Sequence, residues 1–284
     1  MRNVYMKACA KINLTLDVLG KRSDGYHELS SVMQSIALYD TLLISKTNRQ
    51  GIELKTDCPA LPVDEDNLIY RAAQLLLSEY KIKQGISIEL HKKIPLAAGL
   101  AGGSSDCAAT LLGLNDLFEL DIPQKELFEL GQRLGADVPF CIMSGTALAE
   151  GVGEKLAPLP PHPKTWIVLA RLPILVSTKE IFLRWSREAA CYPRSSAMME
   201  ALKTGDINEI AVNLGNGLTP VATALHPEIN TLIVAFQDQN AVGVNMTGSG
   251  PTVFAYFSTE FAAFKAIEYI KKQLPSCELF NLKI

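Results

Sequence analysis

The chain has 284 residues, of which 48% are hydrophobic and 20% charged, and its formal net charge is -3. This mix is that of a globular protein with room for one large or two ordinary domains. A negative total offers no basic surface to a nucleic acid or an anionic membrane. The most apolar stretch, residues 166–176, is too short for a membrane helix and contains Arg171. We therefore expect neither nucleic acid nor membrane as a partner.

Six cysteines are scattered along the chain with no C-x-x-C spacing. Such a pattern argues against a zinc ribbon, a redox motif and a compact disulfide framework. Single thiols spread through a long chain are typical of a reducing compartment. The N-terminal residues lack the apolar run of a secretory signal. We expect a cytoplasmic protein.

The first part of the chain is predicted to form strands. Residues 12–18 alternate apolar and polar side chains, which is the pattern of a half-buried strand. Residues 41–45 and 51–55 repeat this pattern. Residues 22–25 lie between the first two predicted strands, and Gly25 favours a turn there.

Helical spacing appears next. Apolar residues recur at helical intervals from 66 to 80, with Asp66 as the expected N-cap. Residues 86–90 alternate and predict a strand. Helices are expected over 107–117 and 123–134, the first of them after a glycine-rich segment.

Residues 158–163 contain four prolines and predict a loop between an N-terminal half, 1–158, and a C-terminal half, 159–284. The second half is expected to hold a strand at 166–172 and a pair of strands on either side of 248–250. A helix at 261–274 and a terminal strand complete the prediction. The fold class is α+β.

The glycine-rich segment follows a predicted strand and opens a helix, which is where backbone N–H groups converge on an anion. Glycines let the backbone approach a phosphate closely, and serine hydroxyls can bond phosphate oxygens or ligate magnesium. A flexible loop with an ordinary serine N-cap is the alternative. The segment is neither a Walker A loop nor a G-x-G-x-x-G loop. Its residues are Pro95, Leu96, Ala97, Ala98, Gly99, Leu100, Ala101, Gly102, Gly103, Ser104 and Ser105.

Residues 95–105 resemble the ATP-binding signature of the GHMP kinases. Residues 8–14 and 246–254 resemble the N-terminal and C-terminal motifs of the same superfamily, in the expected order. The resemblance thus covers most of the chain. It implies a two-domain α/β architecture with a ribosomal-protein-S5-like N-terminal domain and an active site in the cleft between the domains.

Three further segments, 20–28, 134–140 and 149–154, resemble the diphosphocytidyl-methylerythritol kinases among the GHMP kinases. That likeness implies an enzyme that phosphorylates the 2-hydroxyl of 4-diphosphocytidyl-2-C-methylerythritol in the non-mevalonate isoprenoid pathway. ATP and Mg²⁺ would be its cofactors, and its partner would be a small-molecule substrate.

The motif match makes Asp137 the candidate general base and Lys11 the cation that stabilises the transferring charge. Without the motifs, Asp137 would be a loop residue or an N-cap, and Lys11 a solvated strand residue.

The substrate would be read by several segments. Tyr26 and His27 are expected to stack on and bond the cytosine, although half-buried packing is the alternative. Asn13 lies two residues after Lys11 on the same strand face and would bond the substrate, or it is an ordinary exposed strand residue. Thr247, Gly248 and Ser249 would meet the diphosphate, and a tight hairpin turn accounts for them equally well.

For the nucleotide, the resemblance places adenine at Asn67, Leu68 and Lys92, and Ser105 is the candidate Mg²⁺ ligand. The chain departs from the family pattern at Cys9, where proline is usual, and at Ala101, where glycine is common. Ala101 matters if that position requires a positive φ, because a Cβ is disfavoured there. His91, His162 and His226 show no ligand spacing and are expected to be structural or exposed.

Two alternatives remain open from the sequence. One is another GHMP kinase, of homoserine or mevalonate type, against which the Asp24–His27 segment argues because those substrates carry no base. The other is a GHMP-fold protein that binds ligands without turnover. The chain is expected to be a monomer or a homodimer.

Overall fold

The computed structural model describes residues 2–186 and 194–284. The chain forms two compact units. Unit 1 comprises residues 2–10, 38–96 and 101–144, and unit 2 comprises 11–37, 97–100 and 145–284. Strands β1 (Asn3–Asn13) and β3 (His27–Thr47) each contribute residues to both units. The predicted domains, 1–158 and 159–284, stay a prediction.

The sheet of unit 1 is centred on β5 (Gly85–His91). This strand pairs in parallel with β4 (Ile52–Thr56) and antiparallel with the second part of β3, where Ile44 faces Ile88. Both isoleucines are fully buried. β-Branched side chains pack well on a pleated surface, so this face of the sheet carries the core of unit 1.

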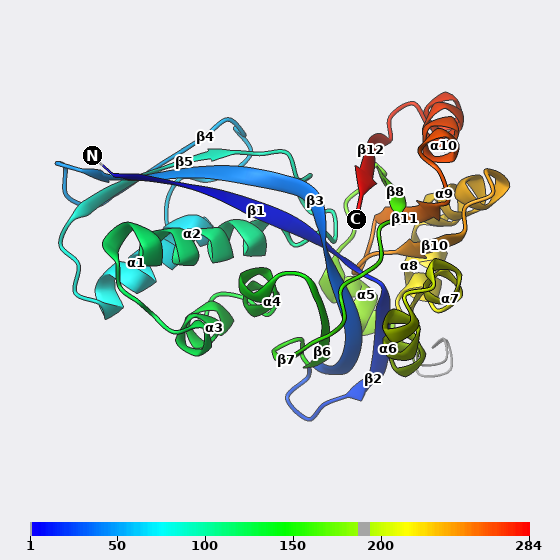
Figure 1. The fold of residues 1–284 in the computed structure, drawn as a ribbon, viewed down its shortest axis with the longest axis horizontal. Helices are drawn as coiled ribbons and strands as arrows, with labels where there is room; N and C mark the ends of the chain where they lie inside the picture. Colours follow the sequence, from blue (N-terminus) through cyan, green and yellow to red (C-terminus); the bar gives the residue numbers. More distant parts are fainter. Residues whose placement is uncertain (1, 187–193) are drawn as a thin grey trace. The chain divides into compact units, whose positions relative to one another are not determined.

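Helices cover that face of the unit 1 sheet, as Figure 1 shows. Next to the sheet are α1 (Leu68–Glu79) and α2 (Gly102–Phe118), while α3 (Gln124–Gln132) and α4 (Val138–Met143) pack on α2. Helix α2 is buried along most of its length and packs on both α1 and α4. Gly113 permits this approach, because a Cβ there would lie 2.5 Å from Ile44 Cδ1. The glycine therefore sets how closely α2 meets the sheet.

Unit 2 contains two groups of strands. In the first, β2 (Thr15–Lys21) pairs antiparallel with the first part of β3 and parallel with β9 (Gly215–Asn216). The first part of β3 also pairs with β6 (Thr146–Gly151), which continues to β7 (Lys155–Pro158).

The second group is an antiparallel sheet of four strands in the order β10 (Gly243–Met246), β11 (Thr252–Phe257), β8 (Trp166–Arg171) and β12 (Glu278–Lys283). Helices α9 (Pro227–Asp238) and α10 (Glu260–Gln273) pack on it. Every residue of β11 is buried, which makes this strand the centre of the second core. The remaining helices of unit 2 are α5 (Thr178–Arg184), α6 (Ser195–Thr204), α7 (Ile207–Val212) and α8 (Thr219–Leu225).

Most predicted elements are confirmed, and the α+β class is confirmed. The prediction of one half-buried strand over 12–18 is wrong. The strand is interrupted at Leu14, whose carbonyl accepts from Gly215 N and from Asn245 Nδ2. Both faces of this segment are buried, because its polar side chains form hydrogen bonds inside the unit.

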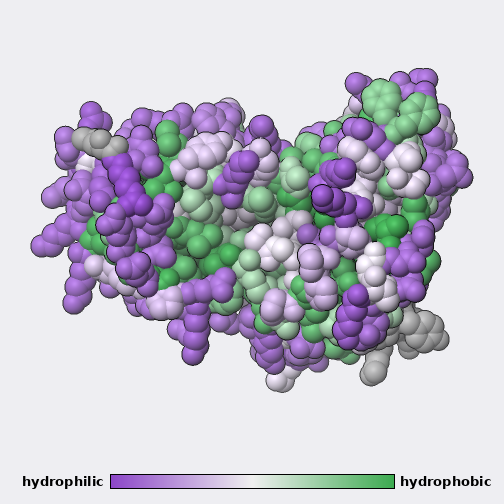
Figure 2. All heavy atoms as spheres, viewed as in Figure 1, coloured by the Kyte–Doolittle hydropathy of each residue, from purple (hydrophilic) through white to green (hydrophobic). Residues whose placement is uncertain are grey.

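Helix α10 buries Ala263, Ala266 and Ile270 but leaves Phe261 and Phe264 exposed. Figure 2 shows apolar side chains gathered on the surface over this helix. Among the described helices, none is long and apolar enough to span a membrane. Cys9, Cys58, Cys107 and Cys277 form no disulfides, while Cys191 lies outside the described residues.

His162 is a half-buried structural histidine, and a structural role is one of the two that the sequence predicted. Its Nδ1 lies 2.6 Å from the carbonyl oxygen of Pro163, which can only accept, so Nδ1 carries the proton. Nε2 then accepts from the hydroxyl of Tyr256, at 3.0 Å. Burial lowers the pKa of His162 below its ordinary value. The ring is therefore held neutral.

This arrangement predicts acid sensitivity. Because the pKa of His162 is lower in the folded state, the unfolded state binds more protons below about pH 6.5, and stability falls as pH falls. Urea unfolding between about pH 7.5 and pH 5.5 is expected to show a smaller loss of unfolding free energy in His162→Gln than in wild type, by up to about 1 kcal/mol. Equal losses in the two proteins would contradict this account.

Candidate active site

The glycine-rich segment ends inside a helix. Helix α2 begins at Gly102, five residues before the predicted start at 107, so Gly102 to Ser105 form its first turn. Ser105 N donates to Ala101 O at 2.9 Å and starts the helical ladder. The N–H groups before it have no acceptor within the helix. Together with the helix dipole they form a group that attracts anions.

Three residues of this segment adopt the left-handed conformation. The φ angles are 51° at Ala97, 72° at Gly99 and 56° at Ala101. Ala101 is the N-cap residue of α2. The departure from glycine at this position therefore has a cost, because the left-handed region disfavours a Cβ by roughly 1–2 kcal/mol.

Gly99 is required for a second reason. A Cβ at this position would lie 2.5 Å from the carbonyl oxygen of Thr247, which is closer than any real contact. Thr247 Oγ1 donates to Gly99 O at 3.2 Å, and Lys11 N donates to Leu100 O at 3.1 Å. Within unit 2, residues 97–100 are thus attached to both the N-terminal and the C-terminal motifs.

Ser105 is fixed by strand β1. Its hydroxyl donates to the backbone carbonyl of Cys9 at 2.6 Å. This bond uses no side-chain atom of residue 9, so cysteine in place of the usual proline preserves it. Burial raises the pKa of the Cys9 thiol, which keeps it neutral.

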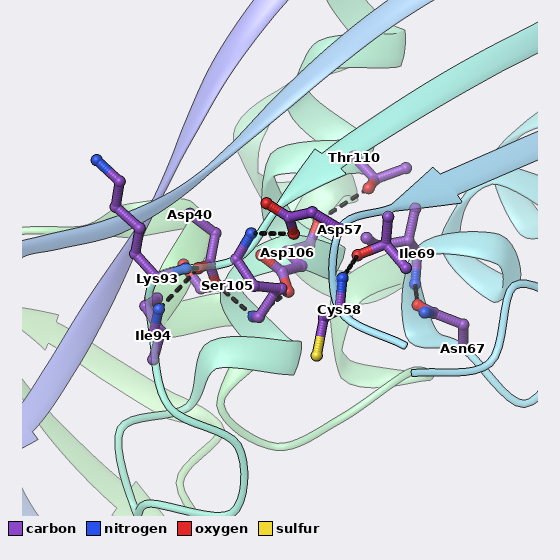
Figure 3. A network of polar contacts seen from close by, with 12 residues as sticks. Asp40, Asp57, Cys58, Asn67, Ile69, Lys93, Ile94, Ser105, Asp106 and Thr110 are labelled. Atoms are coloured by element: carbon purple, nitrogen blue, oxygen red, sulfur yellow. Dashed lines mark hydrogen bonds and ion pairs between the residues drawn. The ribbon is translucent and has the colours of Figure 1, made fainter. Parts of the chain in front are cut away.

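Lys92, Asp40 and Asp106 form a buried ion triad next to the first turn of α2 in unit 1, and Figure 3 labels its two aspartates. The ammonium of Lys92 contacts Asp106 Oδ2 at 2.7 Å and also contacts Asp40 Oδ2. Asp40 Oδ1 accepts from the backbone N–H groups of Lys93 and Ile94. All three charged side chains are at most 7% exposed. The triad therefore joins β3, the chain after β5, and α2.

The two carboxylates determine the charge of Lys92. Burial alone would lower the pKa of Lys92, but Asp106 and Asp40 outweigh it, so that the pKa is raised and the ammonium stays charged. Burial raises the pKa of Asp106, and Lys92 counteracts this in part. Asp106 Oδ1 is buried and has no hydrogen-bond partner among the described residues.

Asn67 is the N-cap of α1, and the prediction of Asp66 in this role is wrong. Asn67 Oδ1 accepts from Ile69 N at 2.9 Å, and Nδ2 donates to Pro62 O at 2.7 Å. The chain is in the extended region at Asn67, as an N-cap requires. Leu68 Cδ1 lies 3.7 Å from where a Cβ of Gly103 would be. The predicted adenine segment and the first turn of α2 are therefore neighbours.

Asn13 connects two other predicted site segments within unit 2. Its Oδ1 accepts from Lys11 Nζ at 2.8 Å and from Gly248 N at 3.0 Å. Its Nδ2 donates to Ser31 Oγ at 2.8 Å. Asn13 and Lys11 are both buried, so neither is the ordinary exposed strand residue that the alternative described.

The loop of residues 247–250 connects β10 to β11 as a tight turn, in which Gly250 N donates to Thr247 O. Asn216 Nδ2 donates to the carbonyls of Met246 and Gly248, at 2.8 Å each. Ser249 Oγ lies 2.8 Å from the hydroxyl of Thr178. The tight turn that the alternative described is therefore present. Asn216 and Thr178 hold it in one conformation, which does not conflict with the predicted diphosphate contact.

His27 lies in an aromatic cluster of unit 2. Its ring centroid is 5.1 Å from that of Phe182 and 5.5 Å from that of Trp185. Burial, followed by the charge of Lys21, lowers the pKa of His27. Tyr26 is 67% exposed on the turn beside it. The pair offers one half-buried ring and one exposed ring.

Asp137 is the N-cap residue of α4, the position that the alternative to a catalytic role described, but its side chain makes no capping hydrogen bond. Its carbonyl accepts from Cys141 N at 3.1 Å, and Pro139 occupies the first turn of the helix. Its side chain is half-buried. The carboxylate is thus carried by a short, fixed element.

No group of three or more histidine, cysteine, aspartate or glutamate side chains in 2–186 and 194–284 could hold a metal ion. Mg²⁺ bound with a nucleotide needs only one or two protein oxygens, since phosphates and waters supply the rest. Ser105 Oγ keeps its lone pairs while donating to Cys9, so it fits such a role.

Sequence reasoning missed Asp40, Asp106 and Asn216. Asp106 directly follows Ser104 and Ser105, and this position next to the predicted phosphate segment could have marked it as a site residue. Asp40 ends an apolar run, and a charge at such a place suggests a buried partner. Nothing local singles out Asn216.

Comparison with known proteins identifies the class. Residues 67–145 match the family model of the GHMP kinases N terminal domain, and residues 198–276 match that of the GHMP kinases C terminal. The geometry of the glycine-rich segment and these matches define a GHMP kinase.

The chain is 42% identical over 274 residues to a 4-diphosphocytidyl-2-C-methyl-D-erythritol kinase of Lachnospira eligens, covering 96% of this chain and 95% of the relative. It is 45% identical over 269 residues to that of Caldicellulosiruptor saccharolyticus, covering 94% and 93%. A crystal structure of 4-(cytidine 5'-diphospho)-2C-methyl-D-erythritol kinase superposes with a TM-score of 0.85 at 32% identity, covering 98% of each chain. The chain belongs to the 4-diphosphocytidyl-2-C-methyl-D-erythritol kinase family.

The conformation of Ala101 yields a prediction. Ala101→Gly removes the cost of a Cβ at φ 56°, offset in part by the greater freedom of glycine in the unfolded chain. We expect the variant to gain about 0.5–1 kcal/mol of unfolding free energy, measured by urea denaturation. Ala108→Gly, inside α2, is the matched control and is expected to lose stability. A loss in Ala101→Gly would contradict the strain at this position.

Proposed function

We propose that this protein transfers the γ-phosphoryl group of ATP to the 2-hydroxyl of 4-diphosphocytidyl-2-C-methyl-D-erythritol, in the non-mevalonate pathway of isoprenoid synthesis in the cytoplasm. The observation that carries the proposal is the sequence identity of 42% and 45%, over nearly the whole chain, to two kinases of this name. The attachment of Lys11 and the 247–248 turn to one buried amide, that of Asn13, supports it.

The nucleotide side of the proposal uses unit 1 and the glycine-rich segment. The triphosphate would lie on the N–H groups of residues 97–104, at the positive end of α2. Asn67, Leu68 and the aliphatic part of Lys92 would border the adenine. Ser105 would hold Mg²⁺, which neutralises phosphate charge when bound.

The acceptor side requires a proton acceptor and a cation. The 2-hydroxyl oxygen forms a bond to the γ-phosphorus while the bond from phosphorus to the bridging oxygen of ADP breaks. We assign Asp137 to take the hydroxyl proton and Lys11 to stabilise the transferring charge. Asn13 Oδ1 orients the Lys11 ammonium at 2.8 Å.

Asn13 also has capacity left for the substrate. Its Oδ1 has both lone pairs engaged, and one of its two N–H bonds is donated to Ser31. The other N–H can donate to a substrate oxygen. Thr247, Gly248 and Ser249 would meet the diphosphate in the turn between β10 and β11, where the Gly248 N–H already donates to Asn13 Oδ1.

Cytosine recognition would fall to Tyr26 and His27. The exposed ring of Tyr26 can stack on a flat base, and the neutral His27 ring can both donate and accept hydrogen bonds. Homoserine and mevalonate carry no base, so this pair would serve no purpose with them.

The first experiment measures ADP release with ATP and Mg²⁺, offering 4-diphosphocytidyl-2-C-methyl-D-erythritol, mevalonate and homoserine in parallel. We expect turnover of the cytidine compound alone. Asp137→Asn and Lys11→Met are each expected to lower kcat by at least about 10²-fold with little change in KM, because their role is in the transition state. Wild-type turnover of mevalonate or homoserine, or of no acceptor, would overturn the assignment.

Recognition of the base has its own test. Tyr26→Ala is expected to raise KM for the cytidine substrate about tenfold, since stacking on an aromatic ring contributes roughly 1–3 kcal/mol per base. KM for ATP should stay unchanged. Tyr5→Ala, at another exposed tyrosine (62%), is the matched control. Equal KM values for Tyr26→Ala and wild type would remove Tyr26 from the site.

A further inference from the structure

The buried triad connects the two ends of the phosphate segment. Asp40 lies within the long β3 strand and accepts from the N–H groups of Lys93 and Ile94, the two residues before Pro95. Asp106 is in α2, one residue after the serine pair. Lys92 lies between the two carboxylates. Its ammonium therefore links the entry of the segment to its exit.

The triad also touches the first turn of α2 directly. A Cβ on Gly102 would lie 3.4 Å from Lys92 Nζ and 3.0 Å from Ile94 Cγ2. The ammonium and Ile94 thus pack against the backbone of Gly102, whose neighbouring N–H groups begin the helix.

Stability alone does not account for the triad. Replacing a buried ion pair by apolar side chains of similar volume is often neutral or stabilising. The triad also carries a formal charge of minus one when both carboxylates are ionised, beside a segment proposed to bind a polyanion. The raised pKa of Asp106 lets a proton relieve this charge. Because burying three charges costs free energy, we look for the role of the triad in the position that it gives to the start of α2.

We infer that Lys92, held by Asp40 and Asp106, is a positioning residue that fixes the first turn of α2 for the phosphates of ATP. This inference rests on the proposed function only in taking ATP as the ligand. The ammonium of Lys92 acts through the backbone of the first turn of α2. It therefore affects the affinity for the phosphates and not the affinity for the base.

The decisive comparison is between Asp106→Leu and Asp106→Asn. Asp106→Leu leaves the balanced pair of Lys92 and Asp40 but removes the link to α2. Asp106→Asn keeps a hydrogen-bond acceptor for Lys92 with the same shape. Binding of ATP, ADP and adenosine is measured by titration calorimetry without acceptor substrate, at a temperature at which thermal scans show each variant to be folded.

We expect Asp106→Leu to bind ATP and ADP about tenfold more weakly and adenosine as tightly as wild type. Asp106→Asn should stay within about threefold of wild type for all three ligands. Simple electrostatics predicts the opposite sign for Asp106→Leu, because both variants remove a negative charge near the phosphates. Tighter ATP binding by Asp106→Leu would therefore overturn the inference.

Lys92→Met provides a second measurement, since it removes the ammonium and keeps the aliphatic chain. It should weaken ATP and ADP more than adenosine, whose base the aliphatic part of Lys92 would border, and Lys93→Met, next to it in sequence, is the control. Equal loss for all three ligands in Lys92→Met or Asp106→Leu would make the triad a base contact or a purely structural one, and would overturn the inference.

Failure of the proposed function is distinguishable from failure of the inference. Phosphate-dependent binding without turnover of any alcohol would contradict the enzyme assignment and leave the binding comparison valid. A wild type that binds ATP no better than adenosine would overturn the inference directly.

Discussion

The ammonium of Lys92 is the charge on which the arrangement of unit 1 depends. A buried cation is tolerated only where carboxylates compensate it, and Lys92 has Asp40 on one side and Asp106 on the other. Because these residues come from three separate segments, satisfying one charge fixes the middle of β3, the chain before Pro95 and the start of α2 together. The glycine-rich segment is attached at both ends to this fixed frame.

In unit 2 a neutral side chain, and not an ion, holds separate segments of the chain together. The amide of Asn13 joins Lys11, Gly248 and Ser31, and Asn216 holds the other side of the same turn. Neutral amides cost less to bury than charges and have directional donors and acceptors. A loop without regular secondary structure thereby acquires a defined shape, which a site for a small molecule needs.

The sequence was sufficient for most of the fold, because periodicity and glycine or proline residues mark strands, helices and turns locally. Local signals misplaced the start of α2 and the N-cap of α1, since glycine disfavours helix and Asp66 and Asn67 are equally good caps by type. Ordered motifs named the family, and the comparisons confirmed it. Asp40 and Asn216 were beyond reach, because their partners are distant in sequence and only the folded chain brings them together.

The contacts of Asn216 bear on the chemical durability of the protein. Asn216 precedes Gly217, and asparagine followed by glycine is the pair most prone to deamidation, in which the glycine nitrogen attacks the side-chain amide. Here Gly217 N donates to Leu16 O at 2.8 Å, and the Asn216 side chain is held by Met246, Gly248 and Leu218 N. The nucleophile and the electrophile are both restrained while the region is folded. Deamidation at Asn216 would consequently proceed through local opening, and its rate would record how often that opening occurs.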